Sequence, residues 1–414
     1  MTVGEQMYKI EKEETTKLLL NLVNIDSPYF KEDRIMEYVQ DWLINNNIDA
    51  SIHEYHESNV TDFKGKNVVV VLEGNNSGPV ICLNGHLDTV MLCKGWTTAP
   101  KGELIGDRLY GVGALDMKSG CAATMIALKA FTENHKSFDG KIIAAFVSVE
   151  EGPYGMGTNA LIEDGYLKNV DFSIITEPSA GFTGKEFPDI CFGARGGYGL
   201  EIELFGKSTH AANPQLGVSA AVDAAKVICE LENVEYIEDP HLGKGSVCVV
   251  AVESDGGACS VPDYAMIRLF WHIVIGENED TITKEVKKAI ERANIECSYK
   301  INFREVPSEG ARGFMPYTIT GEEPMTKAFM SAIEKVCNTK PTISYFQSIG
   351  DFNYLGTRIG APAVIFGAAG SNFHGSDEYV ELDSVVKTAE VIYTFLEKVL
   401  CSYSQDDDPV ACGR

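Results

Sequence analysis

The sequence predicts an α/β protein in which a small domain is inserted into a larger one. Apolar runs without alternation recur in the first 180 residues, as in NVVVVLEG at 67–74 and VICLNG at 80–85, and such runs are typical of strands buried on both faces. Segments with helical spacing of apolar residues separate them. The pattern changes near residue 190 and returns after residue 306, and 414 residues exceed what one hydrophobic core usually organises.

The larger domain is predicted from residues 1–189 and 307–414. It begins with two helices, at 8–25 and 31–46, in which apolar residues recur at helical spacing. Continuous apolar strands are predicted at 67–74, 80–85, 141–149 and 171–176, and a helix at 118–132 separates two of them. Buried strands separated by a helix indicate a central, mostly parallel sheet.

Residues 190–306 are predicted to form the inserted domain. Its segments are YGLEIELFG, GVSAAVDAAKVICELE, SVCVVAV, YAMIRLFWHIV, TITKEVKKAIERA and CSYKINF. Their order, β-α-β-β-α-β, is that of a ferredoxin-like split unit. The helix PMTKAFMSAIEKVC, the strand PAVIFG and the helix ELDSVVKTAEVIYTFLEKVL then complete the larger domain, and the tail SYSQDDDPVACGR is expected to be frayed.

The composition excludes two classes of partner. The formal net charge is −25 and the pI about 4.7, and such a field repels nucleic acid and anionic membranes, so neither is expected as a partner. The eleven cysteines show no CxxC pairing, the segment MTVGEQMYKIEKEETTK lacks a signal-peptide core, and no apolar run is long enough to span a membrane. We therefore expect a reducing, cytoplasmic location.

Ionisable side chains gather at five points where apolar runs end. They are His86 with Asp88, Asp116, Glu150 with Glu151, Glu177, and His374. In open α/β sheets, ligands bind at the carboxyl ends of the strands. Two imidazoles and three carboxylates suit two divalent, zinc-like ions with one carboxylate bridging them. Because neighbours at a strand end face different ways, one of the paired glutamates can ligate while the other takes a proton from water.

Six ordered motifs make the chain resemble a known family. They are NGHLDTV, GVGALDMKSG, VSVEEGPYGMGT, IITEPS, GKSTHAANPQLGVSA and FHGSDEYV. Between about residues 10 and 400 the sequence resembles the metallopeptidase and amidohydrolase family of acetylornithine deacetylase, succinyl-diaminopimelate desuccinylase, aminoacylase, glutamate carboxypeptidase and related dipeptidases. The resemblance implies a zinc-peptidase-like catalytic domain, a ferredoxin-like lid and dimerisation domain at 190–306, and a homodimer.

The resemblance also implies a set of metal ligands. His86 and Glu177 would bind one ion, Glu151 and His374 would bind the other, and Asp116 would bridge the two. The ions are expected to be zinc, with cobalt and manganese as alternatives.

Three further residues take roles from the same resemblance, which also implies one cis peptide bond. Glu150 would be the general base that activates the bridging water, and Asp88 would orient the imidazole of His86. His210, in GKSTHAANP, would stabilise the oxyanion, from the same subunit or from a partner subunit. A cis peptide is expected between Asp116 and Met117.

One stretch departs from the family pattern. Many members have an asparagine and an Asp-x-Arg triplet that hold the substrate carboxylate, whereas this chain has Cys259 and then Phe270-Trp271-His272. His272 is a candidate anion contact, although it is neutral at pH 7 unless its pKa is raised. Arg268 shares its strand face and could assist, and Arg195 is expected to brace the domain junction. The departure argues against ornithine or diaminopimelate derivatives as substrates. The aromatic residues Phe270 and Trp271 favour a substrate with a larger apolar acyl group or side chain.

We therefore expect a dimetal hydrolase that cleaves an amide or peptide bond in a small substrate, either an N-acyl amino acid or a dipeptide. One alternative is a non-catalytic, metal-stabilised binding relative, although such a protein needs no base beside its ligands. A dizinc aminopeptidase is the other alternative, but that class lacks the inserted domain. The remaining histidines that we considered are not expected to be ligands: His53, His56, His135 and His241.

Overall fold

The computed structural model describes residues 8–152 and 154–401, so the tail predicted to fray, from residue 402, lies outside the described residues. The chain divides into two compact units. The first comprises Met1–Phe192, Ile319–Ser344 and Arg358–Arg414, and the second comprises Gly193–Thr318 and Tyr345–Thr357. The sequence placed the domain boundaries at 189/190 and 306/307 and had no second segment at 345–357.

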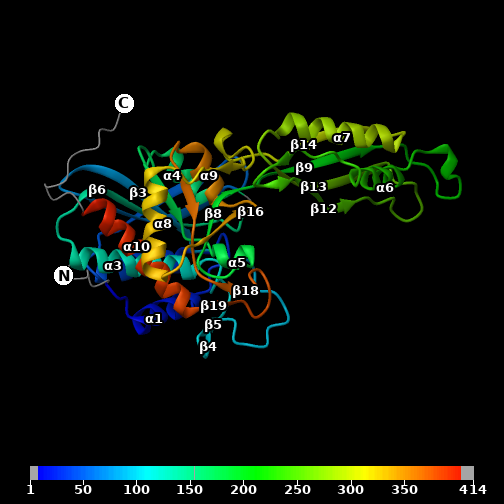
Figure 1. Cartoon of the computed structure of the whole chain (residues 1–414). Coiled ribbons are helices and arrows are strands. Elements are labelled where there is room, and N and C mark those ends of the chain that lie inside the picture. The colour runs from blue at the N-terminus through cyan, green and yellow to red at the C-terminus, as the bar shows by residue number, and fades with distance from the viewer. Residues whose placement is uncertain (1–7, 153, 402–414) are drawn as a thin grey trace. The chain divides into compact units, whose positions relative to one another are not determined.

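The first unit is an α/β structure (Figure 1). Its helices are α1 (Lys12–Val23), α2 (Asp33–Asn45), α3 (Lys118–Asn134), α4 (Met156–Glu163), α5 (Ser179–Thr183), α8 (Pro324–Cys337) and α10 (Leu382–Leu400). Its main strands are β1 (Ser51–Glu57), β2 (Phe63–Glu73), β3 (Asn76–His86), β6 (Asp139–Val147), β7 (Phe172–Ile175) and β17 (Ala363–Ile365). The strands β8 (Asp189–Ala194) and β16 (Thr342–Phe346) each run across a boundary between the units.

The main sheet is mixed, with a parallel centre. Within the described residues its order is β1-β2-β6-β3-β7-β17-β8, followed by β15 (Tyr317–Thr318), and β16 also pairs with β8. The neighbours β6, β3, β7 and β17 pair in parallel, while the outer pairs β1–β2, β2–β6 and β17–β8 are antiparallel. The predicted α/β class is confirmed, and the parallel pairing that we expected is confined to the central strands.

Burial explains why these segments form strands and helices. β7, β17 and β8 are buried at every residue, and β6 is buried from Ile142 to its end, as expected for strands covered on both faces. α3 and α10 pack against each other and on β3, whereas α2 and α4 pack on β1 and β2. β1, with alternating exposure, forms the polar edge of the sheet, as the sequence SIHEYHE indicates.

The parallel centre determines where functional residues can gather. β3 ends at His86, β6 at Val147 and β7 at Ile175, and because the three strands are parallel neighbours, their carboxyl ends lie along one edge of the sheet. The first unit also contains a small second sheet of four short strands. It has the order β18 (Gly370–Ser371), β19 (Tyr379–Glu381), β5 (Arg108–Tyr110) and β4 (Glu103–Ile105).

The second unit has the predicted β-α-β-β-α-β order. Its elements are β9 (Gly196–Phe205), α6 (Ala220–Leu231), β12 (Ser246–Glu253), β13 (Tyr264–Ile273), α7 (Glu279–Ala293) and β14 (Ser298–Phe303), with the short β10 (Glu238–Asp239) and β11 (Gly243–Lys244) and most of α9 (Asp351–Arg358) beside them. The antiparallel sheet order β12-β13-β9-β14 is that of a ferredoxin-like unit. Its core packs α6 and α7 on the sheet around Trp271.

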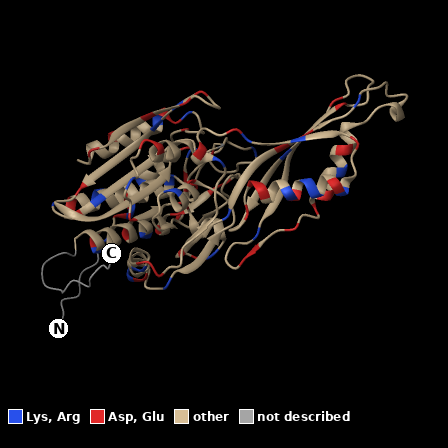
Figure 2. Cartoon of the chain, turned by 90° about the horizontal axis from the view of Figure 1, so that it is seen from above, with Lys and Arg blue, Asp and Glu red and all other residues tan. Residues whose placement is uncertain are grey.

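Charge is spread over the surface. Along α7, for example, acidic and basic side chains alternate with the apolar residues that face the core (Figure 2). Within the described part of the chain, no helix combines the length and the apolar character needed to cross a bilayer.

Candidate metal centre

Five segments far apart in the sequence bring ionisable residues to the carboxyl edge of the parallel strands. His86 ends β3, Glu151 follows β6, and Glu177 follows β7. Asp116 lies two residues before the start of α3, and the peptide bond that follows it, Asp116–Met117, is cis, as expected. His374 follows β18 and adopts a left-handed backbone conformation, with φ of 58°.

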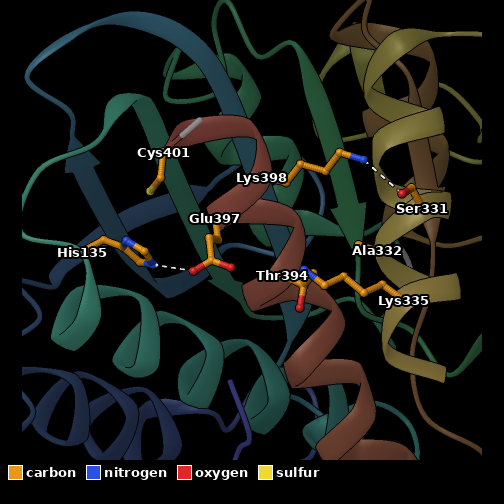
Figure 3. Close-up of a pocket in the computed structure, with 8 residues that line it drawn as sticks. All are labelled: His135, Ser331, Ala332, Lys335, Thr394, Glu397, Lys398 and Cys401. Carbon is orange, nitrogen blue, oxygen red and sulfur yellow. Dashed lines mark hydrogen bonds and ion pairs between the residues drawn. The ribbon is translucent and has the colours of Figure 1, made fainter. Parts of the chain in front are cut away.

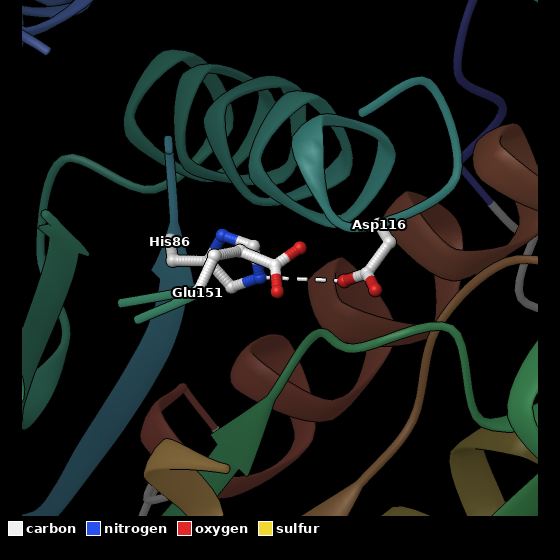
Figure 4. Close-up of side chains that lie close together, drawn as sticks. All are labelled: His86, Asp116 and Glu151. Atoms are coloured by element: carbon white, nitrogen blue, oxygen red, sulfur yellow. Dashed lines mark hydrogen bonds and ion pairs between the residues drawn. The ribbon is translucent and has the colours of Figure 1, made fainter. Parts of the chain in front are cut away.

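One side of this cluster is built around His86. Its Nε2 atom lies 3.3 Å from Asp116 Oδ1 and 3.4 Å from Glu177 Oε1. The other side is built around His374, whose Nε2 lies 3.3 Å from Asp116 Oδ2 and 2.9 Å from Glu151 Oε1. The two oxygens of Asp116 therefore face different imidazoles, as a bridging carboxylate requires. Figure 4 shows the side chains of His86, Asp116 and Glu151 pointing toward one another.

The cluster fits divalent cations. Zinc–ligand distances of about 2.0–2.1 Å place two ligands of a tetrahedral ion about 3.3–3.4 Å apart, which matches three of the four separations above. In two overlapping sets, His86 with Asp116 and Glu151 and His86 with Glu150 and Glu177, the ligand atoms lie within 4.8 Å of one another. Glu177 Oε2 is buried without a hydrogen-bond partner, and an orphaned buried carboxylate oxygen is expected where a cation belongs.

Electrostatics show how crowded the acids are. Burial, and then the charge of Asp116, raises the pKa of Glu177 to about 8 and that of Glu151 to about 7. Hydrogen bonds to Asp116 and Glu151 raise the pKa of His374 to about 11. Burial alone lowers the pKa of His86, but the neighbouring carboxylates, that of Glu177 first, outweigh it and raise this pKa well above its ordinary value. The cluster therefore holds protons that a bound cation would displace.

Asp88, which the sequence analysis expects to orient the imidazole of His86, contacts that ring through its backbone oxygen, while its carboxylate contacts backbone amides. His86 Nδ1 donates to the backbone oxygen of Asp88 at 3.0 Å, while the Asp88 carboxylate lies 3.6 Å from that nitrogen. This orientation leaves Nε2 of His86 facing the other ligands. The fully buried carboxylate instead accepts hydrogen bonds from the backbone amides of Glu150, at 3.1 Å, and Glu151, at 2.9 Å. Asp88 therefore ties the paired glutamates to the end of β3.

Glu150 lies at the mouth of the cluster. Its side chain is 12% exposed and its Oε2 lies 3.9 Å from His86 Nε2. Glu150 thus belongs to the set of ligating atoms formed with His86 and Glu177, whereas Glu151 contacts His374. The two adjacent glutamates face different parts of the site, as the strand-end argument predicted.

Glu378 is a residue of the site that the sequence analysis missed. It is buried, and its carboxylate accepts hydrogen bonds from the backbone amides of Gly113, Leu115 and Asp116 at 2.9–3.0 Å. Burial raises its pKa to about 8. The signal was its place in FHGSDEYV, four residues after His374, since this spacing brings the acid to the loop that carries Asp116.

An aromatic pair beside His374 was also missed. The Phe182 and Phe373 rings lie 5.1 Å apart in a T-shaped arrangement, and the Phe373 ring lies 5.8 Å from that of His374. Phe373 is 37% exposed. An apolar surface therefore adjoins the open side of the metal cluster.

The second unit holds the other two predicted site residues. His210 is exposed, in the loop after β9, and its Nδ1 accepts a hydrogen bond from the Ala212 amide at 3.0 Å. The ring proton of the neutral imidazole is therefore on Nε2, which can donate. His272 lies on β13, with Nε2 3.3 Å from the hydroxyl of Ser348. Burial, and then the charge of Arg195, lowers the pKa of His272 to about 4, so this imidazole is neutral at pH 7.

The two arginines considered with them are bound locally. Arg268 donates to Glu201 on the adjacent strand at 2.9 Å, and Arg195 donates to the backbone oxygen of Leu242 at 2.9 Å. The four other histidines have local partners too: His53 contacts Asp164, His56 contacts Asp62, His135 contacts Glu397, and His241 stacks on Tyr345.

A separate cavity of about 600 Å³ lies at the ends of α3, α8 and α10 (Figure 3). His135 pairs with Glu397 at 3.2 Å on one side of it, and Lys398 donates to Ser331 at 3.0 Å on the other. Side chains of both charge signs line this cavity, and several of them already have partners, so it does not select a class of ligand.

Comparison with known proteins places this site in a family. A family model described as Peptidase family M20/M25/M40 matches residues 82–398. The succinyl-diaminopimelate desuccinylase of Psychrobacter arcticus is 27% identical over 410 residues, which cover 97% of this chain and 98% of that protein. The desuccinylase of Rickettsia bellii is 25% identical over 397 residues, which cover 93% and 96%.

Solved structures share the fold. A tripeptidase from Staphylococcus aureus superposes with a TM-score of 0.77 at 20% identity, covering 95% of this chain and 99% of that one. An M20 family metallo-carboxypeptidase from Sulfolobus solfataricus gives 0.75 at 16% identity, covering 93% and 98%. A dipeptidase from Saccharomyces cerevisiae gives 0.75 at 14% identity, covering 95% and 97%.

Proposed function

Because the chain belongs to Peptidase family M20/M25/M40, we propose that its strand-end cluster is a cocatalytic dimetal centre that hydrolyses an amide or peptide bond in a small substrate. The observation that carries this proposal is the arrangement of Asp116, whose two oxygens lie 3.3 Å from the imidazoles of His86 and His374. One carboxylate between two imidazoles, with a further acid on each side, is the donor set of a bridged pair of divalent ions.

We assign His86 and Glu177 to one ion and Glu151 and His374 to the other, with Asp116 shared. Zinc is the proposed metal, since imidazole and carboxylate ligands suit it, and cobalt and manganese are the alternatives. When bound, such ions polarise the substrate carbonyl and lower the pKa of water.

The protein's own residues supply the proton transfers. Glu150 takes a proton from the attacking water and returns it to the nitrogen of the departing amine. The hydrogen bond from its amide to Asp88 keeps the base at the end of β6. His210 donates from Nε2 to the oxygen of the tetrahedral intermediate, within one subunit or across a dimer.

The substrate that we propose is an N-acyl amino acid or a dipeptide. The relatives named succinyl-diaminopimelate desuccinylase and the tripeptidase and dipeptidase structures are consistent with a small amide. His272 is neutral at pH 7 and Arg268 is paired with Glu201, so we propose that His272 contacts substrate as a neutral hydrogen-bonding group. The exposed ring of Phe373 favours a substrate with an apolar acyl group or side chain.

The remaining proposals concern the setting of the enzyme. We propose that the second unit acts as a lid and as the dimer interface, since its edge strand β12 exposes Val250 and Val252. We also propose a cytoplasmic location, because the cysteines are scattered without CxxC pairing.

The test is a substrate screen under metal control. The protein would be stripped with a chelator, dialysed, and supplied with zinc, cobalt or manganese before incubation with N-acyl amino acids, dipeptides and their amidated counterparts. We expect release of free amine from at least one substrate, dependent on metal and abolished by chelator. Metal binding without hydrolysis of any amide in the panel would instead favour the non-catalytic binding relative.

A further inference from the structure

We propose that Glu32 is a positioning residue for the base Glu150, because it holds the backbone amide of Val149, the residue directly before that base. Glu32 lies at the start of α2, more than a hundred residues away in sequence. This inference rests on the proposed function, since it assumes that Glu150 transfers protons.

The contacts of Glu32 are with the backbone. Its side chain is 3% exposed, and its Oε1 atom accepts hydrogen bonds from the amide of Phe30 at 2.9 Å and from the amide of Val149 at 3.2 Å. Although Glu32 is the N-cap residue of α2, its side chain makes no capping bond to that helix. The carboxyl group therefore serves the segment after β6.

That segment adopts an unfavourable conformation. Val149 has φ of 56°, in the left-handed region, where a β-branched residue is a steric outlier. Val149 is fully buried, and its backbone oxygen accepts a hydrogen bond from Met156 at 3.1 Å. Such a conformation persists only when surrounding contacts determine it.

Two buried carboxyl groups hold three consecutive amides. Glu32 accepts from Val149, and Asp88 accepts from Glu150 and Glu151. The turn that carries both the base and a metal ligand is thus fixed from two directions, by the loop before α2 and by the end of β3. Neither Glu32 nor Asp88 ligates a metal in this arrangement, and each acts through the backbone of the residues that do the chemistry.

The expected consequence is kinetic. A displacement of a catalytic group by about 1 Å can cost about 100-fold in rate, so loss of the Glu32 acceptor should lower kcat about 10- to 100-fold, with KM and metal content little changed. Burial, and then the charge of Asp88, raises the pKa of Glu32 to about 8. The neutral amide of glutamine is therefore a close substitute that keeps the acceptor oxygen.

The experiment compares Glu32→Gln with Glu32→Met, two side chains of similar length of which only the first retains an acceptor. Glu57→Met is the matched control, because Glu57 is also buried and also accepts from backbone amides, those of Asn59, Val60 and Thr61, in the turn after β1. Each variant would be measured for kcat, KM, metal content and melting temperature. Hydrogen–deuterium exchange of a peptide spanning residues 148–155 would be followed on the metal-free protein.

We expect Glu32→Gln and Glu57→Met to keep kcat close to that of the wild type. We expect Glu32→Met to have a lower kcat and faster exchange of the 148–155 peptide. Equal kcat for Glu32→Met and the wild type would overturn the inference. A lower kcat in Glu32→Met would also overturn it if metal content fell in proportion, or if Glu57→Met lost kcat to the same extent. A wild-type protein that hydrolyses no amide would defeat the proposed function, whereas unchanged exchange in Glu32→Met would defeat the Glu32 contact itself.

Discussion

The two units hold their candidate residues in different ways. In the first unit, five residues from five segments contact one another at the carboxyl edge of the parallel strands. In the second unit, His210 and His272 are each bound to a local partner, Ala212 and Ser348. The first arrangement has buried acids with raised pKa values and an orphaned oxygen, which few structures tolerate without a cation.

Contacts among several ligating atoms are stronger support for a functional site than a single hydrogen bond to a local partner. Mutual contacts among ligating atoms define a site by themselves, because burying several acids together is costly unless a cation compensates. A single imidazole with a hydroxyl or amide partner is compatible with a structural role as well as with a functional one. The chemistry of the first unit can therefore be tested by removing one group, while the roles in the second unit need matched controls.

The largest expected effect tests the chemistry of the first unit. Glu150→Gln removes the proposed base and should lower kcat about 10²- to 10⁴-fold, with metal content unchanged, because the ligands remain. Steady-state kinetics and elemental analysis measure the two quantities. Glu73→Gln, at an exposed ion pair with Lys141, is the control. A Glu150→Gln enzyme of normal kcat would remove this residue from the mechanism.

The next effect decides whether the second unit contributes to the chemistry. His210→Ala removes the proposed oxyanion donor and should lower kcat about 10²- to 10³-fold with little change in KM. His241→Ala, in the same unit, should leave kcat unchanged. If His210→Ala keeps the same kcat as His241→Ala, then His210 takes no part in the reaction, and the proton and oxyanion chemistry belongs to the first unit alone.

A smaller effect tests the backbone contacts of Asp88. Asp88→Asn keeps the shape of the side chain but replaces one acceptor with a donor that faces an amide, so activity should fall about 10- to 100-fold. Asp189→Asn is the control, because Asp189 is equally buried but accepts from Ser344 and Thr183. It should lower the melting temperature without lowering kcat. A matching loss of kcat in both variants would show that Asp88 acts only through stability.

The smallest effect concerns pH and the second unit. The pKa of His272 is lowered to about 4 in the folded protein, from an ordinary value of 6.5, so the unfolded chain binds a proton there at pH values where the folded chain does not. Stability contributed by the neutral ring is present above pH 6.5 and is lost progressively as pH falls toward 4. Urea unfolding at several pH values should show a shallower decline for His272→Gln. Parallel curves for the two proteins would contradict the lowered pKa.

Much of the fold could be predicted because its signals are local. The buried run in β6 and the helical spacing in α10 report burial directly, since side-chain polarity follows the faces of each element. The strands of the small sheet, such as β18 and β19, have two or three residues each. A segment of that length has no period, so only its partners across space reveal it.

For the candidate site, the sequence by itself determined which residue types stand at the strand ends, and the family motifs assigned them roles. Tertiary structure alone decided that the carboxylate of Asp88 turns to the amides of Glu150 and Glu151, that Glu378 holds the loop of Asp116, and that Glu32 reaches Val149. The reason is physical. The polarity and period of a segment are written in its own residues, whereas a hydrogen bond across a hundred residues exists only after the sheet has closed and brought its partners together.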